Sequence, residues 1–407
     1  MLLKVNSVFW WVSVAAVTTF VVVVVSAGHI SSSRSPYTAS IEACSTTELQ
    51  EVLQIDCWYS VLRDVFDNEG TQRAFEVFVE IYDGYPVFAN SGCHRHAHRV
   101  GDMAYYYDYL THKDLSKVAF PKNASTCGYG FYHGFFEHLV QDVPDLDFVT
   151  RTCEFMADIL LENAPAIQQT CYHGTGHGLV LAIADELLKP EEWSLQAFTY
   201  KPLKFCDSLP KAREKDKEDC RQGVFNVIVD WMADGEYNLS YNLKEPFAVC
   251  DIYENVYKPD CYYEIAQKLD KASDFNTVNM VTLVQQIKDP SLQNMAMSVG
   301  MAGIVQHDPL GEKSMLLGEC LGIPDSLQDA CVVGLLGGLV EHGIEGDYIT
   351  AINFCELEMP SEVRKACYEE LQNKLLRFET ESTVVGMCDS EVLTKGYCAF
   401  HAESMSI

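Results

Sequence analysis

The sequence has few basic side chains for its length. Its 407 residues include 29 Lys and Arg against 58 Asp and Glu, which gives a formal net charge of −29. Because recognition of phosphate groups needs positive charge, this balance argues against nucleic acid and anionic membrane surfaces as partners. Cations, including metal ions, are more natural partners. A hydrophobic content of 48% with 21% charged residues also excludes a disordered chain.

Common catalytic signatures are absent as well. The sequence has no glycine-rich phosphate loop with its Lys and no Gly-x-Ser-x-Gly turn. It also lacks alternating apolar and polar runs longer than a few residues, which half-buried strands would need. Amphipathic segments with a helical period are present instead, for example residues 261–269 and 361–376. These patterns predict an all-α protein, with the charged stretch from Lys211 to Asp219 as a solvated loop.

An apolar run at the N-terminus indicates the compartment. Lys4 precedes the run from Val8 to Ala27, and no Lys or Arg follows until Arg34. This charge asymmetry places the N-terminus in the cytoplasm and the rest of the chain outside. A run of this length can cross a bilayer, so we predict that residues 1–28 form a hydrophobic helix that anchors the protein in the membrane. The alternative is a cleaved signal peptide and a secreted protein, because small residues end the run.

The rest of the chain is expected to be one extracytoplasmic domain. A linker at residues 29–43 leads into an all-α domain at residues 44–407, with a site-bearing half at 90–200 and more regular repeats at 205–407. In an oxidising compartment, its 16 cysteines are expected to form disulfides. The sequons at Asn123 and Asn238 predict a glycoprotein.

The cysteines mark a repeat. The clearest pattern is Pro, six residues, Cys or Met, two residues and Gly, as in residues 324–334 and 290–300. Successive markers lie about 35 residues apart, with insertions in the middle of the chain, which is the size of a helical-hairpin repeat. We therefore predict an α-solenoid of hairpins, with a closed α/α toroid as the alternative. The markers are Cys57, Cys93, Cys127, Cys171, Cys220, Cys261, Met297, Cys331, Cys367 and Cys398.

Most marker cysteines have a partner cysteine a short distance upstream. Such separations, usually with a Pro between, suit a disulfide across the turn that joins two helices. The repeat whose marker is Met297 also lacks an upstream cysteine, so both partners are absent together. The predicted pairs are Cys44–Cys57, Cys93–Cys127, Cys153–Cys171, Cys206–Cys220, Cys250–Cys261, Cys320–Cys331, Cys355–Cys367 and Cys388–Cys398.

Most of the 12 histidines gather in three of these repeats, close behind Cys93, Cys127 and Cys171. Each of the three repeats carries two ligand-type side chains four residues apart, which lie on one face of a helix. If equivalent helices are neighbours, the three pairs converge on one wall and can hold a metal ion. The predicted ligands are His94, His98, His133, Glu137, His173 and His177, with Glu137 also the candidate general base.

Further residues near these pairs are candidates for orienting the ligands or contacting a substrate. They are His96, His138, Asp102, Tyr105 and Tyr132. Imidazole with carboxylate suits Zn, Fe or Cu, as one ion or two, and the donor types do not choose among them. Glycines beside the pairs lower helix stability, which indicates that neighbouring backbones approach closely. They are Gly134, Gly174, Gly176 and Gly178.

Two other interpretations of the cluster remain: a metal-free catalytic or pH-sensing histidine group, and simple packing. A later repeat shows why packing must be weighed. Glu341 and His342 repeat the spacing of Glu137 and His138 from their marker, yet Gly337 stands where a ligand histidine would be. Histidines outside the cluster are interpreted as ordinary surface or core residues, namely His29, His112 and His401.

Two short stretches resemble known families. The disulfide-linked hairpins resemble the cysteine-rich helical repeats of secreted proteins, which mostly bind partners. Residues 171–176 are similar to the Cys-His-Gly zinc motif of the lanthionine synthetase cyclases, with Tyr172 inserted. The cysteine spacing of the repeat family is shorter and more regular than the spacing here, and the likeness to the cyclases covers only residues 171–176, so neither resemblance implies ligands or an activity.

The sequence therefore predicts a membrane-anchored extracytoplasmic protein with a His/Glu metal centre. We expect a metal-dependent enzyme, with hydrolysis favoured slightly over oxidation. The alternative is a scaffold without catalysis that sequesters metal or binds a protein partner on its concave repeat face.

Overall fold

A computed structural model describes residues 36–45, 50–89, 91–160, 162, 164–187, 189–307, 313–341, 348–379, 381–389 and 393–404. The predicted hydrophobic helix at residues 1–28 lies outside these ranges, as do His29 and His342. Within them, no helix is both long and apolar enough to cross a membrane.

The prediction of an all-α protein is confirmed, because the described residues form helices and no strand. The first helices are α1 (Thr38–Cys44), α2 (Glu51–Gly84), α3 (Pro86–Ala89), α4 (Cys93–Ala104), the π-helix η1 (Tyr105–Tyr109), α5 (Leu110–His112), η2 (Leu115–Lys117), α6 (Gly130–Asp142), α7 (Leu146–Leu160) and α8 (Ile167–Glu186). The next are η3 (Pro190–Glu192), α9 (Leu195–Asp207), α10 (Glu214–Asp234), η4 (Glu236–Asn238), η5 (Pro246–Ile252), α11 (Lys258–Ala266), α12 (Leu269–Ala272) and α13 (Thr277–Val284). The last are α14 (Pro290–His307), α15 (Lys313–Gly322), α16 (Asp325–Glu341), α17 (Tyr348–Phe354), α18 (Ser361–Phe378), α19 (Glu381–Asp389) and α20 (Lys395–Ser404).

Disulfides join all 16 cysteines in the pairs expected from their spacing. Their Cα–Cα distances of 5.2 to 5.8 Å are typical of disulfides. Cys153–Cys171, Cys206–Cys220 and Cys320–Cys331 each link one helix to the next along the chain. Cys93–Cys127 instead links the start of α4 to the segment before α6. Eight disulfides indicate an oxidising, extracytoplasmic compartment.

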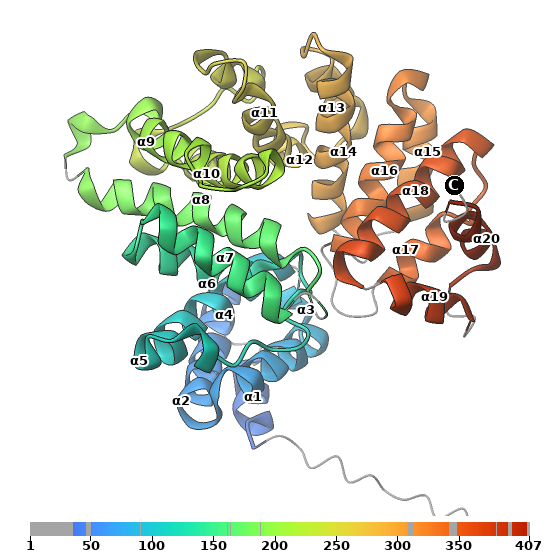
Figure 1. Ribbon diagram of the computed structural model, residues 1–407. Helices are drawn as coiled ribbons and strands as arrows, with labels where there is room; N and C mark the ends of the chain where they lie inside the picture. Colours follow the sequence, from blue (N-terminus) through green and yellow to red (C-terminus); the bar gives the residue numbers. More distant parts are fainter. Residues whose placement is uncertain are drawn as a thin grey trace, which may run out of the picture.

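One set of helices packs in succession. α4 contacts α6, and then α8, α10, α11, α14, α16 and α18 follow, each against the one before it. Figure 1 shows the chain following the same order around an arc from α1 and α2 to α20. The ends of the succession also meet, because Tyr129, just before α6, donates its hydroxyl to the carbonyl oxygen of Arg377 in α18 at 2.5 Å. The ring of Tyr129 also lies 5.5 Å from that of Phe378.

The expected solvated loop at residues 211–219 was wrong in part. Helix α10 begins at Glu214, and both Asp216 and Asp219 are buried. The side chain of Asp216 accepts hydrogen bonds from the backbone and the guanidinium of Arg213, which closes the start of the helix. Paired charges of this kind are compatible with burial, so a charged run alone does not predict a loop.

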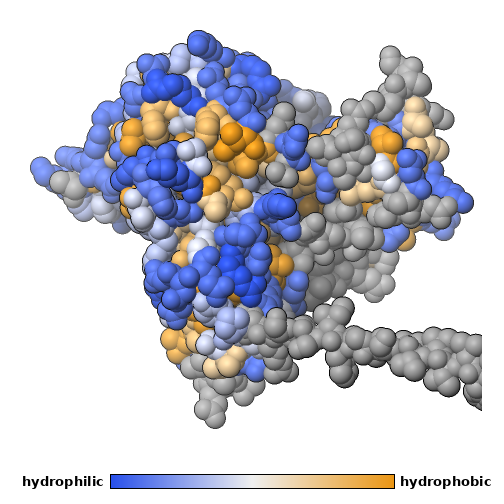
Figure 2. All heavy atoms as spheres, turned by 60° about the horizontal axis from the view of Figure 1, so that its bottom comes forward, coloured by the Kyte–Doolittle hydropathy of each residue, from blue (hydrophilic) through white to orange (hydrophobic). Residues whose placement is uncertain are grey.

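The outer surface is mixed in polarity. Figure 2 shows one face, on which hydrophilic residues surround smaller apolar patches. The buried apolar side chains form one core cluster that extends from Ile41 to Tyr397. The disulfides and this shared core hold the successive helices in fixed positions, which sets the geometry of the site described next.

Candidate metal centre

Three neighbouring helices supply the histidine-rich residues. α4 carries His94 and His98, α6 carries His133 and Glu137, and α8 carries His173 and His177. Because α6 packs against both α4 and α8, the three pairs come to one place.

The glycines beside these pairs allow the helices to approach. A carbon atom added to Gly134 would lie 2.1 Å from the carbonyl oxygen of His98 on α4. One added to Gly178 would lie 2.3 Å from the carbonyl oxygen of Glu137 on α6. Both distances are shorter than non-bonded carbon–oxygen contacts allow, so these positions require glycine at the present helix separation. The close approach inferred from the sequence is confirmed at both positions.

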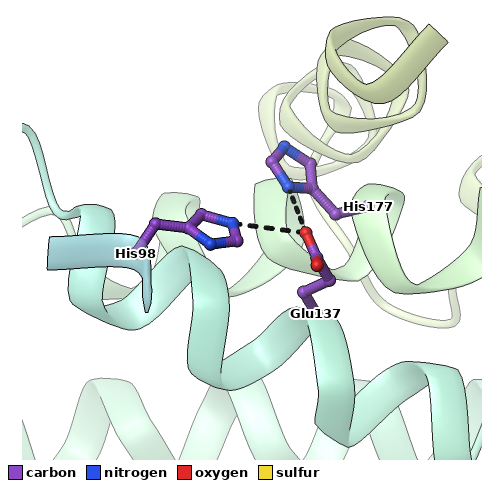
Figure 3. A group of neighbouring side chains, drawn as sticks. All are labelled: His98, Glu137 and His177. Atoms are coloured by element: carbon purple, nitrogen blue, oxygen red, sulfur yellow. Dashed lines mark hydrogen bonds and ion pairs between the residues drawn. The ribbon is translucent and has the colours of Figure 1, made fainter. Parts of the chain in front are cut away.

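Glu137 lies between two imidazole rings. Its Oε2 is 3.2 Å from Nε2 of His98 and 3.0 Å from Nδ1 of His177. Figure 3 shows both rings directed at this carboxylate from the neighbouring helices. The three side chains are 22%, 14% and 5% exposed for His98, Glu137 and His177. Two ligands of a tetrahedral ion with bonds of about 2.0–2.1 Å are about 3.3 Å apart, so these spacings match those of a coordinated set.

A second group lies one helical turn toward the start of each helix. His94, His133 and His173 occupy these positions, and Nδ1 of His133 is 3.2 Å from Nε2 of His94. The rings of His133 and His173 are 4.8 Å apart. Nδ1 of His94 donates to the carbonyl oxygen of Cys127 at 2.9 Å. That hydrogen bond puts the proton of a neutral ring on Nδ1 and leaves a lone pair on Nε2, as metal-binding histidines require.

Burial and charge shift the pKa values in opposite directions. Burial lowers the pKa of His98, but the charges of Glu137 and Asp102 outweigh it and hold that pKa well above its usual value. Burial raises the pKa of Glu137, but the nearby His98 and His177 outweigh it and keep the carboxylate ionised. Burial and neighbouring imidazoles lower the pKa values of His133 and His173 well below the usual range. Without metal the site therefore holds an ionised Glu137, a protonated His98 and neutral imidazoles at His133 and His173, so a metal ion that binds His98 must displace its proton.

One imidazole nitrogen of the cluster lacks a hydrogen-bond partner among the described residues. Nε2 of His177 is buried and has no hydrogen-bond partner among the residues that the structure describes. A buried imidazole nitrogen without a partner is costly, since such groups are normally hydrogen-bonded. Sites that store strain or bind ligands are where such exceptions are found.

Asp102 and His138 extend the cluster. Oδ1 of Asp102 is 3.4 Å from Nδ1 of His98 and 3.5 Å from Nε2 of His138. The donor atoms of Asp102, Glu137 and His138 all lie within 4.8 Å of one another, as do those of His98, Glu137 and His177. Two of the five residues expected to orient the ligands or contact a substrate, Asp102 and His138, therefore lie beside the ligands.

Of the other residues expected near the ligands, His96 and Tyr132 lie elsewhere and Tyr105 lies beside His138. His96 faces the opposite side of α4, where Nε2 is 2.8 Å from the carbonyl oxygen of Phe88 and Nδ1 is 2.5 Å from the hydroxyl of Tyr59. Burial lowers the pKa of His96 to about 4, so the ring is neutral. Tyr132 is buried among aromatic rings that include Phe136. Tyr105 donates its hydroxyl to Asp142 and packs beside His138 at a ring distance of 5.7 Å.

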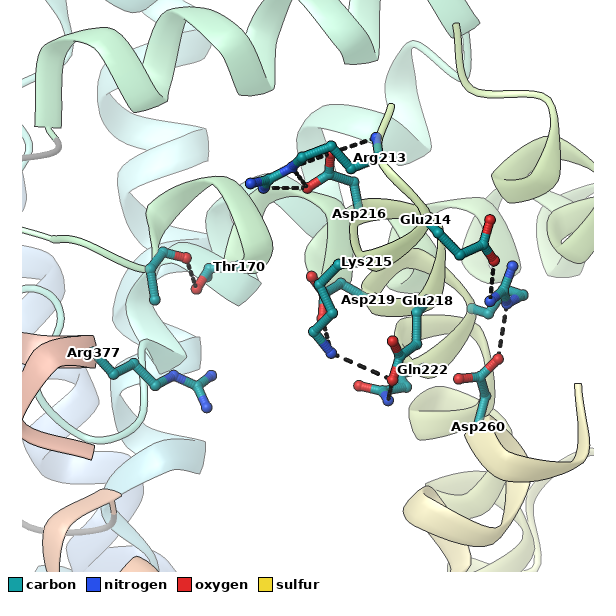
Figure 4. A network of polar contacts seen from close by, with 12 residues as sticks. Thr170, Arg213, Glu214, Lys215, Asp216, Glu218, Asp219, Gln222, Asp260 and Arg377 are labelled. Carbon is teal, nitrogen blue, oxygen red and sulfur yellow. Dashed lines mark hydrogen bonds and ion pairs between the residues drawn. The ribbon is translucent and has the colours of Figure 1, made fainter. Parts of the chain in front are cut away.

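A central cavity of ≈ 550 Å³ adjoins the cluster. His94, His133 and His173 line it on one side, and residues of α10, α11, α14, α16 and α18 line the rest. Polar and charged side chains from α10 and α18 face this space. In Figure 4, Arg377 reaches from α18 toward Thr170 of α8, and Lys215 of α10 pairs with Glu218 and Asp219.

Sequence analysis missed this charged wall. Glu341 accepts from Lys374 at 2.6 Å and from Arg377 at 2.8 Å across α16 and α18. Burial raises the pKa of Asp219 to about 6, although Lys215 opposes the shift. These residues stand far from the histidines in sequence and form no local motif, so only the register of the repeat could have placed them near the site.

Comparison with known proteins assigns no family. No family model, no curated protein and no solved structure matches the chain.

Proposed function

We propose that this chain is an extracytoplasmic enzyme that uses a divalent transition metal. The observation that carries the proposal is the convergence of His98, Glu137 and His177 from three helices, with donor spacings of 3.0 and 3.2 Å. Two imidazoles and one carboxylate are a common donor set of catalytic zinc and non-haem iron sites, and they leave coordination positions open. The metal is Zn, Fe or Cu on this donor chemistry.

The proposed architecture is a closed helical toroid rather than an open solenoid. The contact of Tyr129 with Arg377 and Phe378 supports closure, because it joins helices at opposite ends of the packing succession. A closed ring would give the cavity a fixed wall on every side, and the metal centre would lie one helical turn beyond the histidines that line it.

The proposed chemistry is metal-assisted hydrolysis. A bound ion of this kind polarises a carbonyl or phosphoryl oxygen and lowers the pKa of a bound water. The protein's own groups would hold the ion and position the substrate. Glu137 would serve as a ligand or as the general base, and the polar cavity beside His133 and His173 would receive the substrate.

The N-terminal segment completes the proposal. Residues 1–28 would anchor the chain in a membrane, or would be removed as a signal peptide. Asn123 and Asn238 are both exposed, which supports glycosylation at these sequons.

Elemental analysis of the purified full chain tests the proposal. We expect a stoichiometric transition metal in the wild type and its loss in His98→Ala and His177→Ala. His112→Ala is the matched control, because His112 also faces a carboxylate four residues away, Asp108, at 3.2 Å but lies outside the cluster. A wild-type protein without stoichiometric metal after reconstitution with Zn²⁺, Fe²⁺ and Cu²⁺ would refute it.

A scaffold that sequesters metal is the second candidate function. The observation that favours it is the nearby group His94, His133 and His173, which adds enough donors to close a coordination shell. The number of bound waters distinguishes the two functions, because storage and structural sites are closed and catalytic sites keep an open position. X-ray absorption of the metal-loaded protein would measure it. In this second function the protein would also bind a protein partner on its concave face.

A further inference from the structure

We propose that the cluster binds a second divalent cation, in an outer subsite formed by Asp102 and His138 with Glu137 shared between the two ions. This inference rests on the proposed metal centre and extends it. The outer subsite lies on the side of the cluster away from the central cavity.

The position of the outer subsite follows from the register of α4. His94, His98 and Asp102 succeed one another at intervals of four residues, so they form three levels along one helix face. His94 lines the cavity, whereas neither His98 nor Asp102 does. Asp102 and His138 are 25% and 18% exposed, so the outer level is open to solvent.

Gln141 determines which nitrogen of His138 carries a proton. Nε2 of Gln141 donates to Oδ2 of Asp185 at 2.8 Å, and this fixes the orientation of the amide. Its Oε1 is therefore the atom that faces Nδ1 of His138, at 3.1 Å. An oxygen can only accept, so Nδ1 of His138 donates. The neutral ring then has its lone pair on Nε2, which faces Asp102.

Asp102 and His138 thus present two electron-rich atoms to each other. Oδ1 of Asp102 is buried and lies 3.5 Å from Nε2 of His138 and 3.4 Å from Nδ1 of His98, with no partner at hydrogen-bond distance among the described residues. Two acceptors at this distance repel each other unless a cation or a proton lies between them. The separation exceeds the 2.7–3.2 Å of ordinary nitrogen–oxygen hydrogen bonds. It matches the spacing of two ligands on one tetrahedral ion, about 3.3 Å.

Glu137 is the natural bridge between the two ions. Its Oε2 contacts His98 and His177, and its carboxylate belongs to both groups of converging donors. A carboxylate has two oxygens, so one residue can serve two ions about 3.5–4 Å apart. Metal pairs at this distance stabilise both the attacking and the leaving oxygen in hydrolytic reactions.

Tyr106 lies at the entrance to the outer subsite. It belongs to the π-helix η1, its side chain is exposed, and its hydroxyl is 3.5 Å from Nδ1 of His138. Short π-helices often occur at functional sites because the extra residue redirects neighbouring side chains. Here the π-helix begins directly after α4 and places the ring of Tyr106 4.9 Å from that of His138.

The test is the number of Zn²⁺ ions bound by the full chain in equilibrium dialysis, with X-ray absorption of the zinc-loaded protein. We expect about two ions per chain in the wild type and a metal–metal distance of about 3.5–4 Å. His138→Ala and Asp102→Asn should each retain one ion and lose the metal–metal signal. His112→Ala should keep both, because no third His, Cys, Asp or Glu donor joins the His112–Asp108 pair in the part of the chain that the structure describes.

The outcomes separate this inference from the proposed function. One ion in the wild type and one in His138→Ala would overturn the outer subsite and leave the metal centre intact, with His138 as a protonated partner of Asp102. No ion in the wild type would overturn both. Loss of both ions from a folded His138→Ala protein would also overturn the outer subsite as a separate site. Retention of circular dichroism and of all disulfides shows that a variant is folded.

Discussion

Two carboxylates stand at the same place in two repeats and have different partners. Glu137 on α6 and Glu341 on α16 each follow their marker cysteine by ten residues. Glu137 faces the imidazoles of His98 and His177, whereas Glu341 faces Lys374 and Arg377. The repeat therefore fixes where the carboxylate lies, and the neighbouring helices decide whether it can bind a metal or neutralises cations.

A third carboxylate has neither type of partner. Glu264 on α11 is fully buried, and its Oε2 accepts from the amides of Asn226 and Gln267, each at 2.7 Å. Burial raises its pKa to about 8, so the side chain is protonated at neutral pH. The same functional group, a carboxyl, therefore has imidazoles as partners at Glu137, cations at Glu341 and amides at Glu264.

Metal removal should have the largest effect, and only on the Glu137 region. A ligand at a thousand times its dissociation constant stabilises the folded state by about 4 kcal/mol. We expect a chelator to lower the free energy of unfolding of the metal-loaded wild type and of Glu341→Gln by similar amounts. In Glu137→Gln the chelator should have no effect. Urea unfolding with and without chelator measures the difference, and equal chelator effects on all three proteins would contradict it.

Replacing a glycine should have the next largest effect, and the effect should differ between Gly134 near Glu137 and Gly337 near Glu341. Gly134→Ala would force a carbon against the carbonyl oxygen of His98, so we expect a loss of about 3 kcal/mol of stability together with weaker metal binding. Gly337→Ala is the control in the other region, where the added carbon would lie 3.4 Å from the flexible end of Lys374. That change should be neutral or stabilising, because alanine favours the helix by about 1 kcal/mol. Thermal unfolding of both variants, with zinc affinity measured alongside, tests this contrast.

Glu341→Gln should be less severe and should leave metal binding unchanged. It removes the charge that Lys374 and Arg377 share; Lys374 keeps Glu370 at 3.5 Å, whereas Arg377 loses its ion pair in a partly buried place. Because the pair retains some solvent, we expect a loss of about 2 kcal/mol rather than the full cost for a buried ion pair. Denaturant unfolding gives the stability, and zinc dialysis gives the affinity. A drop in zinc affinity as large as that of Glu137→Gln would break the comparison.

The effect of Glu264→Gln should be small at pH 5 and should grow as pH rises. The folded state keeps the Glu264 proton up to a pKa of about 8, whereas the unfolded chain releases it near about 4.3. Between these values unfolding releases a proton, so wild-type stability should fall as pH rises, by at most about 1.4 kcal/mol per unit. The variant should lack this decline and exceed the wild type in stability at pH 8.

Unfolding midpoints in urea across pH 5 to 8.5 would measure this difference. Glu191→Gln is the control, because Glu191 is exposed and should leave the profile unchanged. Parallel profiles for the wild type and Glu264→Gln would show that Glu264 does not hold a proton in the folded state.

The candidate site was accessible from the sequence because its donors recur in register. Positions four residues apart share a helix face whatever the tertiary structure, so the pairs on α4, α6 and α8 could be predicted from spacing alone. His96 shows the limit of that reasoning. It lies two residues from His94 and therefore faces away, where it hydrogen-bonds to Tyr59 and Phe88. Because His96 is not four residues from either ligand histidine of α4, helix geometry excludes it from the ligand face. It was a candidate only because it lies close to them in the sequence.

The chain's sequence determined the helical class, the disulfide pairs and the two-by-two grouping of the ligands, because each depends on local spacing. Only the tertiary structure decided that Glu137 is the shared centre of the donors, that Asp102 and His138 face each other, and that Lys374 and Arg377 line the same cavity as three of the histidines. The physical reason is distance along the chain. Contacts between α4, α6, α8 and α18 depend on how closely the helices pack and on where the succession of helices closes, and no local pattern encodes either quantity.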